Sequence, residues 1–208
     1  SELLEADTFP WCPDLEFRRA VVKPELWESL QVEDYVQARY QQSLAEMPAL
    51  PGEALWERRR REVGWLSLNW FMSTLLDRKD RMSMAAGLEV RVPFCDHHLV
   101  EYVWNIPWAM KAMNGQRKQV LRDAVEGLLP EELLRRPKSP YPKTHDPLYE
   151  QLVRARLLTI LDDRDAPIHS LVDEKALRAG LLSDAGDYGK PWFGQLMAGP
   201  QMLAYLIQ

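Results

Sequence analysis

The stretch that decides the fold is Asp77-Arg-Lys-Asp-Arg-Met-Ser-Met-Ala-Ala-Gly-Leu-Glu-Val-Arg-Val-Pro-Phe-Cys-Asp96, which lies near the middle of a chain of 208 residues. It packs acids, bases and apolar residues more densely than an ordinary solvated face does. Apolar residues recur before it at the three- and four-residue spacing of one helix face. They predict a helix from Glu62 to about Ala86. The charges of the stretch are therefore expected on a rigid element, as part of a site.

The charged residues of this helix allow two interpretations. Asp77 and Arg81 stand four apart with the acid first, the favourable order for an ion pair on one helix. An arginine on a largely buried helix needs a carboxylate, a phosphate or carbonyl oxygens, so Arg78 is a candidate for binding an anion. The alternative is a structural ion network between helices that joins Asp77, Arg78, Asp80 and Arg81. The charge pattern alone favours the network.

After the helix the chain is expected to become extended. Pro93 ends helical geometry and pushes Val92 toward an extended conformation, so Glu89 and Arg91, two apart, share one face. We interpret them as a buried structural pair rather than as catalytic groups. Asp96 precedes an apolar run and is predicted to cap the next helix.

The whole run resembles the signature Asp-Arg-x-Ser-Met-Ala-x-x-Leu-Glu-x-Arg-x-Pro-Phe-x-Asp of the synthetase domain in glutamine-hydrolysing asparagine synthetases. A second family pattern, Pro-x-x-x-Lys-x-x-x-Gly-x-x-Lys-x-x-Leu-Arg, follows downstream, and after it come Leu-Pro and Arg-Pro-Lys. The resemblance covers most of residues 62 to 150 and is far more specific than a short motif. The matching residues are Asp80, Arg81, Ser83, Met84, Ala85, Leu88, Glu89, Arg91, Pro93, Phe94, Asp96, Pro107, Lys111, Gly115, Lys118, Leu121, Arg122, Leu129, Pro130, Arg136, Pro137 and Lys138.

The resemblance implies a carbon-nitrogen ligase that adenylates the side-chain carboxylate of aspartate with ATP and magnesium. Ammonia released from glutamine by a separate N-terminal domain then attacks the adenylate. Lys138 matches the family lysine near the pyrophosphate, so it is the first candidate for catalysis and nucleotide binding, and Arg78 is the second candidate for nucleotide binding. Asp80, Arg81, Glu89, Arg91 and Asp96 are expected to have structural or supporting roles.

Three departures from the family limit what the chain is expected to do alone. Thr74 and Leu75 stand where some members carry an acid that orients the active-site base. The family's Ser-Gly-Gly-x-Asp-Ser pyrophosphate loop and the N-terminal cysteine of its glutaminase half do not occur. The isolated chain is therefore expected to be inactive and to bind no cofactor tightly. Two alternatives stay open: an amidotransferase or cyclase of the same fold that acts on another carboxylate, and a non-catalytic helical interaction module.

Composition and charge argue against several other classes of protein. A net charge of −5 argues against unspecific nucleic-acid binding, and two cysteines fit a reducing cytoplasm. No apolar run approaches the roughly 20 residues of a membrane span. The basic run from Arg58 to Arg61 has acidic neighbours, which favours a solvated helix face. No metal site is predicted, because His97 and His98 have no partners at ligand spacing. Self-association through an exposed apolar face is possible, giving a homo-oligomer.

The pattern predicts an all-α fold, an irregular multi-helix bundle without strands. The resemblance identifies it as the C-terminal helical part of an α/β synthetase domain of the adenine-nucleotide alpha-hydrolase-like type. We expect residues 1–208 to belong to that one portion, behind a poorly patterned lead-in at 1–24, and both chain ends to be cut. The other predicted helices are 25–47 as one helix or a pair, 97–105, 116–128, Pro130 to Arg135, 148–161, 173–182 and 192–207. A proline-stiffened loop at 137–147 is expected to hold Lys138 in place.

Overall fold

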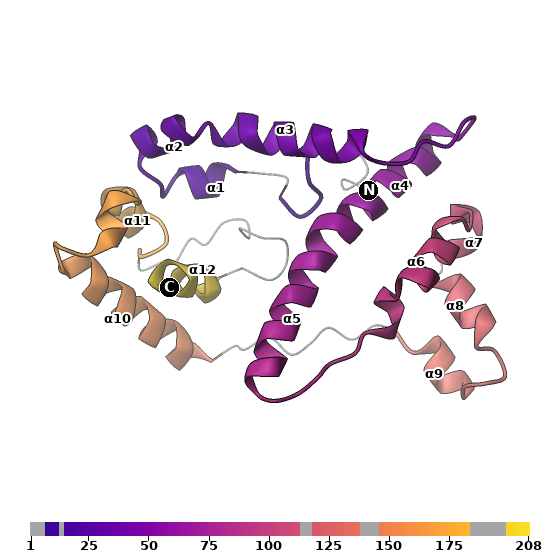
Figure 1. Ribbon diagram of the computed structural model, residues 1–208. Coiled ribbons are helices and arrows are strands. Elements are labelled where there is room, and N and C mark those ends of the chain that lie inside the picture. Colours follow the sequence, from indigo (N-terminus) through magenta and orange to yellow (C-terminus); the bar gives the residue numbers. More distant parts are fainter. Residues whose placement is uncertain (1–6, 13–14, 113–117, 138–145, 184–198) are drawn as a thin grey trace. The chain divides into compact units, whose positions relative to one another are not determined.

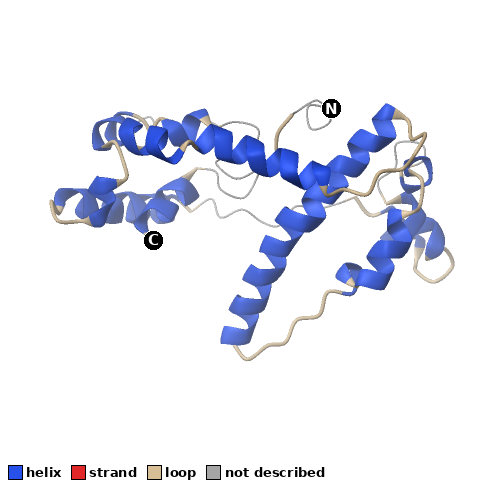
Figure 2. Cartoon of the chain, turned by 45° about the horizontal axis from the view of Figure 1, so that its top comes forward, coloured by secondary structure: helices blue, strands red, loops and turns tan. Residues whose placement is uncertain are grey.

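The computed structural model describes residues 7–12, 15–112, 118–137, 146–183 and 199–208. Within these ranges the chain consists of helices, turns and loops and contains no strand (Figure 2). One isolated antiparallel bridge joins Val22 to Val172. The all-α prediction is therefore confirmed. None of the helices in the described ranges combines the length and the apolar character needed to cross a membrane.

The chain divides into two compact units. The first unit comprises residues 1–47 and 143–208, and the second comprises residues 48–142. The helices of the first unit are α1 (Glu16–Arg19), α2 (Pro24–Leu30), α3 (Val32–Ala45), α10 (Pro147–Asp162), a 3₁₀ turn (Pro167–Ser170), α11 (Glu174–Ala179) and α12 (Pro200–Ile207). The prediction that residues 1–208 form one portion of a synthase domain behind a lead-in at 1–24 stays a prediction.

The core of the first unit forms around α10 and α12. Leu157 and Leu161 of α10 are four residues apart and therefore share one helix face, which packs with Leu177 of α11 and with Met202 and Leu203 of α12. Each such side chain contributes about 1.5–3 kcal/mol when it leaves water. This apolar cluster holds the unit together and leaves the polar faces of its helices to solvent.

Helix ends in the first unit follow the sequence closely. Of the two alternatives predicted over 25–47, one helix or a pair, the structure shows the pair, α2 and α3, which are separated at Gln31 with φ +47°. The carboxylate of Asp146 accepts the main-chain N–H of Leu148 at the start of α10, and that of Asp173 accepts the N–H of Ala176 at the start of α11. Aspartate is suited to this position because its side-chain oxygen binds a main-chain N–H that the first helical turn leaves unpaired.

The second unit is built on one long helical rod. Helix α4 (Leu55–Leu66), a π-helical segment (Ser67–Met72) and α5 (Ser73–Ala85) follow one another without a break (Figure 1). The helix predicted from Glu62 ends where expected but begins earlier, at Leu55. Its first turns carry charges rather than apolar residues, and ion pairs of Arg58 and Arg59 with Glu62 support them. The apolar period therefore missed the start of the helix.

The rest of the second unit comprises a 3₁₀ turn (Pro93–Cys95), α6 (His97–Trp104), α7 (Trp108–Lys111), α8 (Gln119–Ala124) and α9 (Glu131–Arg135). The helix predicted at 116–128 is shorter because the backbone is left-handed at Lys118 (φ +61°) and at Gly127 (φ +75°). The helix predicted at 173–182 is similarly reduced to α11, and the described part of the helix predicted at 192–207 begins at Pro200. Residues 192–198 of that helix lie outside the described residues.

Candidate functional site

The signature run begins on an exposed helix. Arg81 donates from Nε to Oδ1 of Asp77 at 2.9 Å, which confirms the predicted pair. The two side chains are 78% and 62% exposed. An exposed pair at this spacing contributes only about 0.3–0.5 kcal/mol. It therefore orders the two side chains on the helix surface and adds little to the stability of the unit.

Arg78 has a different environment from the one the sequence predicted. No residue of α5 is buried, so the expectation of a largely buried helix is wrong. Arg78, Lys79 and Asp80 are exposed, and their side chains make no hydrogen bond or ion pair within the described residues. Among those residues the four-membered ion network does not form, since only Asp77 and Arg81 meet. The guanidinium of Arg78 is thus exposed, and no described residue accepts a hydrogen bond from it.

The segment after α5 is not helical, and Val92, with φ −125° and ψ 82°, lies outside both the helical and the extended regions. Arg91 donates from Nη2 to Oε1 of Glu89 at 2.7 Å, so the predicted pair is confirmed. The two side chains are 81% and 67% exposed, and the prediction that they are buried is wrong. The reason is geometric, because both project from one face of a segment that no described residue covers.

Asp96 caps α6 as predicted. Its Oδ1 accepts the main-chain N–H of His98 at 2.9 Å and that of Leu99 at 3.4 Å. Thr74, which departs from the family pattern, donates its hydroxyl to the carbonyl oxygen of Trp70 at 2.9 Å. The hydroxyl of Thr74 is therefore engaged by its own helix. Lys138 and most of the proline loop at 137–147 lie outside the described residues. The role of Lys138 therefore stays a prediction.

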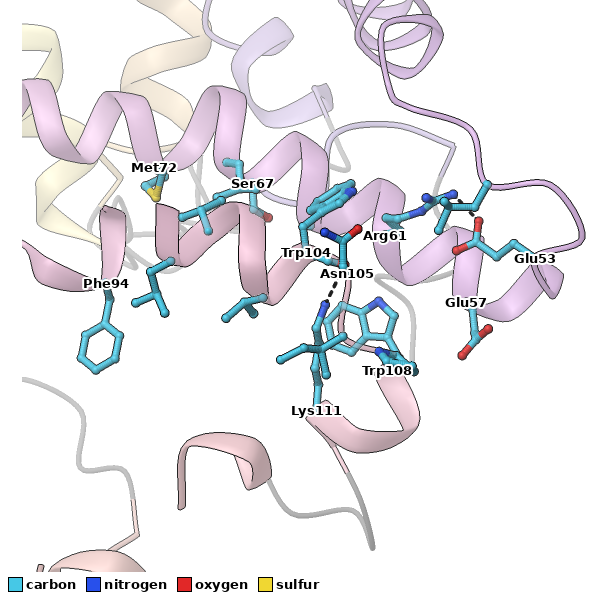
Figure 3. Close-up of a pocket in the computed structure, with 18 of the residues that line it drawn as sticks. Glu53, Glu57, Arg61, Ser67, Met72, Phe94, Trp104, Asn105, Trp108 and Lys111 are labelled. Carbon is cyan, nitrogen blue, oxygen red and sulfur yellow. Dashed lines mark hydrogen bonds and ion pairs between the residues drawn. The ribbon is translucent and has the colours of Figure 1, made fainter. Parts of the chain in front are cut away.

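A cavity of about 850 Å³ opens within the second unit, between the rod and helices α6 and α7. Figure 3 shows Met72 and Phe94 toward one end of this cavity and Glu53 and Glu57 toward the other. Most of its wall is apolar. The apolar lining side chains include Leu68, Phe71, Met72, Leu75, Phe94, Leu99, Val100, Val103, Trp104, Ile106 and Trp108.

A buried ion pair closes the polar end of the cavity. Nη2 of Arg61 bonds to Oε2 of Glu53, and the two side chains are only 6% and 9% exposed. The expectation that the basic run from Arg58 to Arg61 forms a solvated face is therefore wrong at Arg61. Its Nε and Nη1 are buried and have no hydrogen-bond partner among the described residues. No pattern in the sequence links positions 53 and 61, because Glu53 precedes the helix and the apolar period does not reach it.

Lys111 extends along the same polar end. Its Nζ donates to the main-chain oxygen of Trp104 at 3.4 Å and lies 5.2 Å from the centre of the Trp108 ring (Figure 3). Burial lowers the pKa of Lys111 below its ordinary value of 10.5. The sequence drew attention to Lys111 only through the family pattern, and nothing in that pattern predicted the cavity.

Comparison with known proteins places these features in a family. The family model for asparagine synthase matches residues 1–206. The chain is 50% identical over 200 residues to glutamine-hydrolysing asparagine synthetase 3 of Bacillus subtilis strain 168, an alignment that covers 96% of this chain and 33% of that protein. Asparagine synthetase 1 of the same organism is 41% identical over 73 residues, which are 35% of this chain and 12% of that protein.

The human glutamine-hydrolysing asparagine synthetase is 43% identical over 67 residues, which are 31% of this chain and 12% of the human protein. The chain thus spans about a third of the length of asparagine synthetase 3 of B. subtilis, whose alignment covers 33% of it.

Proposed function

This chain belongs to the asparagine synthase family, and on that premise we propose that it forms the helical part of an ATP-dependent ligase that makes asparagine. ATP, accompanied by magnesium, adenylates the side-chain carboxylate of aspartate, and pyrophosphate leaves. Ammonia derived from glutamine then attacks the acyl carbon, and AMP leaves. Glutamine hydrolysis and the pyrophosphate loop are assigned to parts of the protein other than these 208 residues, and Arg78 and Lys138 are proposed to add to the nucleotide site from this chain.

The observation that carries this proposal is the state of Arg78 within the signature run. Its guanidinium is exposed and has no partner among the described residues, although it stands on a continuous helix beside the paired Asp77 and Arg81. A guanidinium presents a planar fork of donors that matches two phosphate oxygens. An unpaired arginine on a rigid element is therefore suited to bind a phosphate without first giving up an internal ion pair.

Lys138 is proposed to supply the second positive charge. A fixed ammonium group beside the pyrophosphate stabilises the charge that develops as this group leaves, and such electrostatic stabilisation is commonly a large contribution to catalysis. Asp96 is proposed to act indirectly, because its cap fixes the start of α6 immediately after the signature run. Asp80, Glu89 and Arg91 are likewise assigned to the shape of the segment rather than to the reacting atoms.

A chimeric enzyme tests the proposal. The 200 aligned residues of asparagine synthetase 3 of B. subtilis are replaced by the corresponding residues of this chain. The chimera is expected to convert aspartate, glutamine, ATP and water into asparagine, glutamate, AMP and pyrophosphate, with AMP and asparagine formed in equal amounts. The isolated chain is expected to form none. Glutamine hydrolysis reports that the host part is intact, and a cooperative melting transition followed by circular dichroism reports that the transplanted part has folded.

Two results would count against the proposal. One is a chimera that still hydrolyses glutamine but forms neither AMP nor asparagine. The other is a Lys138→Ala chimera with unchanged turnover, which would remove Lys138 from catalysis. Lys175→Ala is the matched control, because this lysine lies on α11 in the first unit and outside the signature run.

A further inference from the structure

We propose that the cavity between the rod and helices α6 and α7 is a binding site for a small, largely apolar molecule that carries an uncharged carbonyl oxygen. The site extends beyond the proposed ligase reaction, because its polar end is made by Arg61 and Glu53 rather than by residues of the signature run. Its volume of about 850 Å³ falls within the range of about 300–1,000 Å³ that is typical of small-molecule pockets.

The wall of the cavity favours a ligand whose larger part is apolar. Leu68 and Phe71 line it from the rod, and Val100 and Val103 line it from α6. The rings of Trp104 and Trp108 stand beside its polar end (Figure 3). Aromatic rings offer large faces against which another flat ring can stack. An aromatic ligand therefore fits this wall better than a sugar or a polyanion does.

Arg61 determines which polar group a ligand should carry. Its Nη2 is held by Glu53, whereas Nε and Nη1 are buried and lack an acceptor in the part of the chain that the structure describes. Buried donors without a partner are uncommon in folded proteins and are costly. The side chain of Arg61 also lines the cavity, so a turn of its guanidinium would bring these N–H groups to a ligand oxygen, and the hydrogen bonds formed would remove that cost.

The charges at this end favour a neutral acceptor. Glu53 already balances the charge of Arg61, and Glu57 adds a second carboxylate to the lining. Lys111 contributes a positive charge that burial disfavours. The formal charges of the four side chains therefore cancel. A carboxylate ligand would add an uncompensated negative charge beside Glu53 and Glu57, whereas a ketone or amide oxygen accepts the same hydrogen bonds without one.

A matched pair of ligands tests the site on the chain itself. The probes are 2-acetylnaphthalene and 2-ethylnaphthalene, which have nearly the same shape and differ in the carbonyl oxygen. Binding is followed by tryptophan fluorescence and isothermal titration calorimetry. The ketone is expected to bind at one saturable site and roughly 10- to 100-fold more tightly than the hydrocarbon, since a hydrogen bond from a charged donor discriminates by about that factor.

Two variants locate the site. Val103→Trp fills the cavity and is expected to abolish binding of both probes, whereas Leu152→Trp, at an exposed apolar position of α10, is expected to change neither. The double variant Glu53→Leu/Arg61→Met removes the buried pair as a whole, so no lone charge is left behind. This double variant is expected to bind the hydrocarbon as tightly as the unaltered chain does. It is expected to bind the ketone with the same affinity as the hydrocarbon.

Several results would overturn the site. Failure of both probes to saturate would do so, as would binding that survives Val103→Trp. A preference for the ketone that persists in the double variant would show that Arg61 does not supply the donors. The comparison of the two probes on the unaltered chain does not depend on any variant. 2-Naphthoate is measured alongside, and tighter binding of this carboxylate than of the ketone would contradict the choice of a neutral acceptor.

Discussion

Arg61 and Arg78 carry the same charge but differ in burial, and this difference determines which partners each one depends on. Arg61 is withdrawn from water and bonded to Glu53, so its energy depends on internal partners. Arg78 is exposed and has no partner within the described residues, so its energy depends on what arrives from solution. Removing an exposed, unpaired side chain costs little stability. A substitution at Arg78 should therefore change ligand binding without changing stability, whereas a substitution at Arg61 should change both.

At Arg78 we predict a loss of nucleotide binding without a loss of stability. Arg78→Ala, introduced into the chimeric synthetase, should raise the KM for ATP by roughly 10- to 100-fold, because charge-assisted hydrogen bonds contribute about 1.5–3 kcal/mol. Steady-state kinetics at saturating aspartate and glutamine measures this change. The melting temperature should stay within about 1 °C, since a surface substitution of this kind changes stability by less than about 0.5 kcal/mol.

The control for Arg78 is Arg135→Ala on α9, another exposed arginine, which pairs with Glu131. It should leave the KM for ATP unchanged. A lower melting temperature with a normal KM in Arg78→Ala would instead favour the structural network that the charge pattern suggested.

Glu33 provides a prediction about a single ionisable group. The indole Nε1 of Trp27 donates to both carboxylate oxygens of Glu33, at 2.8 and 2.9 Å. This hydrogen bond is the main reason that the pKa of Glu33 lies below its ordinary value of 4.5, and Arg19 makes a smaller contribution. Because the folded pKa is lowered, the stabilisation is present above pH 4.5 and is lost as the pH falls through the folded pKa.

Substitution of the donor should restore the ordinary titration of Glu33. In Trp27→Phe the pKa of Glu33, followed by NMR of its side-chain carbon, should rise toward 4.5. Arg19→Ala is the matched control and should raise the pKa less, because its charge acts through solvent at an exposed contact of 3.5 Å. An unchanged pKa in Trp27→Phe would show that the indole does not cause the shift.

At the scale of the element, Asp96 determines where α6 starts. Asp96→Ala removes the acceptor for two main-chain N–H groups and should lower the free energy of unfolding of the second unit by about 1 kcal/mol. Urea unfolding followed by circular dichroism measures this loss. Asp96→Asn keeps a side-chain oxygen and should lose at most a few tenths of a kcal/mol. Equal losses in the two variants would mean that the charge of Asp96, and not its cap, is what matters.

The sequence predicted helices best where a local signal marks their ends. Asp96 and Pro130 are such signals, and the helices α6 and α9 begin at the residues that follow them. The start of the rod at Leu55 was missed because charged pairs rather than apolar spacing support its first turns. The apolar spacing on which the prediction rested does not register charged pairs such as those of Arg58 and Arg59 with Glu62.

Burial was predicted less well than secondary structure, and the reason is tertiary. Arg61 was expected in solvent and is buried, whereas Glu89 and Arg91 were expected to be buried and are exposed. Whether a charged side chain is covered depends on the elements that fold over it, and residues distant in sequence supply these. The pairings at Asp77 and Arg81 and at Glu89 and Arg91 were predictable because each is local. The cavity, by contrast, depends on how α6 packs against the rod, which no local spacing encodes.

At the scale of the whole molecule, the two units differ in how much apolar surface they bury. The first unit has a cluster of fully or nearly fully buried residues around α10 and α12. In the second unit α5, α6, α7, α8 and α9 contain no buried residue. Several large apolar side chains there are more than half exposed, among them Met82, Met84, Leu88, Phe94 and Tyr102. So much exposed apolar surface is typical of an interaction face.

The exposed apolar residues of the second unit lead to a prediction about association of the isolated chain. Met82 and Leu88 are 68% and 62% exposed and lie outside the lining of the cavity. We expect the chain to self-associate reversibly at micromolar concentrations, because association removes these side chains from water at about 25 cal/mol per Å². Sedimentation equilibrium measures the association constant. Met82→Ser/Leu88→Ser should weaken association by about tenfold or more, whereas Leu30→Ser/Leu152→Ser, at comparably exposed positions of the first unit, should not. Equal weakening by both double variants would show that association does not depend on these residues of the second unit. A chain that stays monomeric would contradict the prediction that it self-associates.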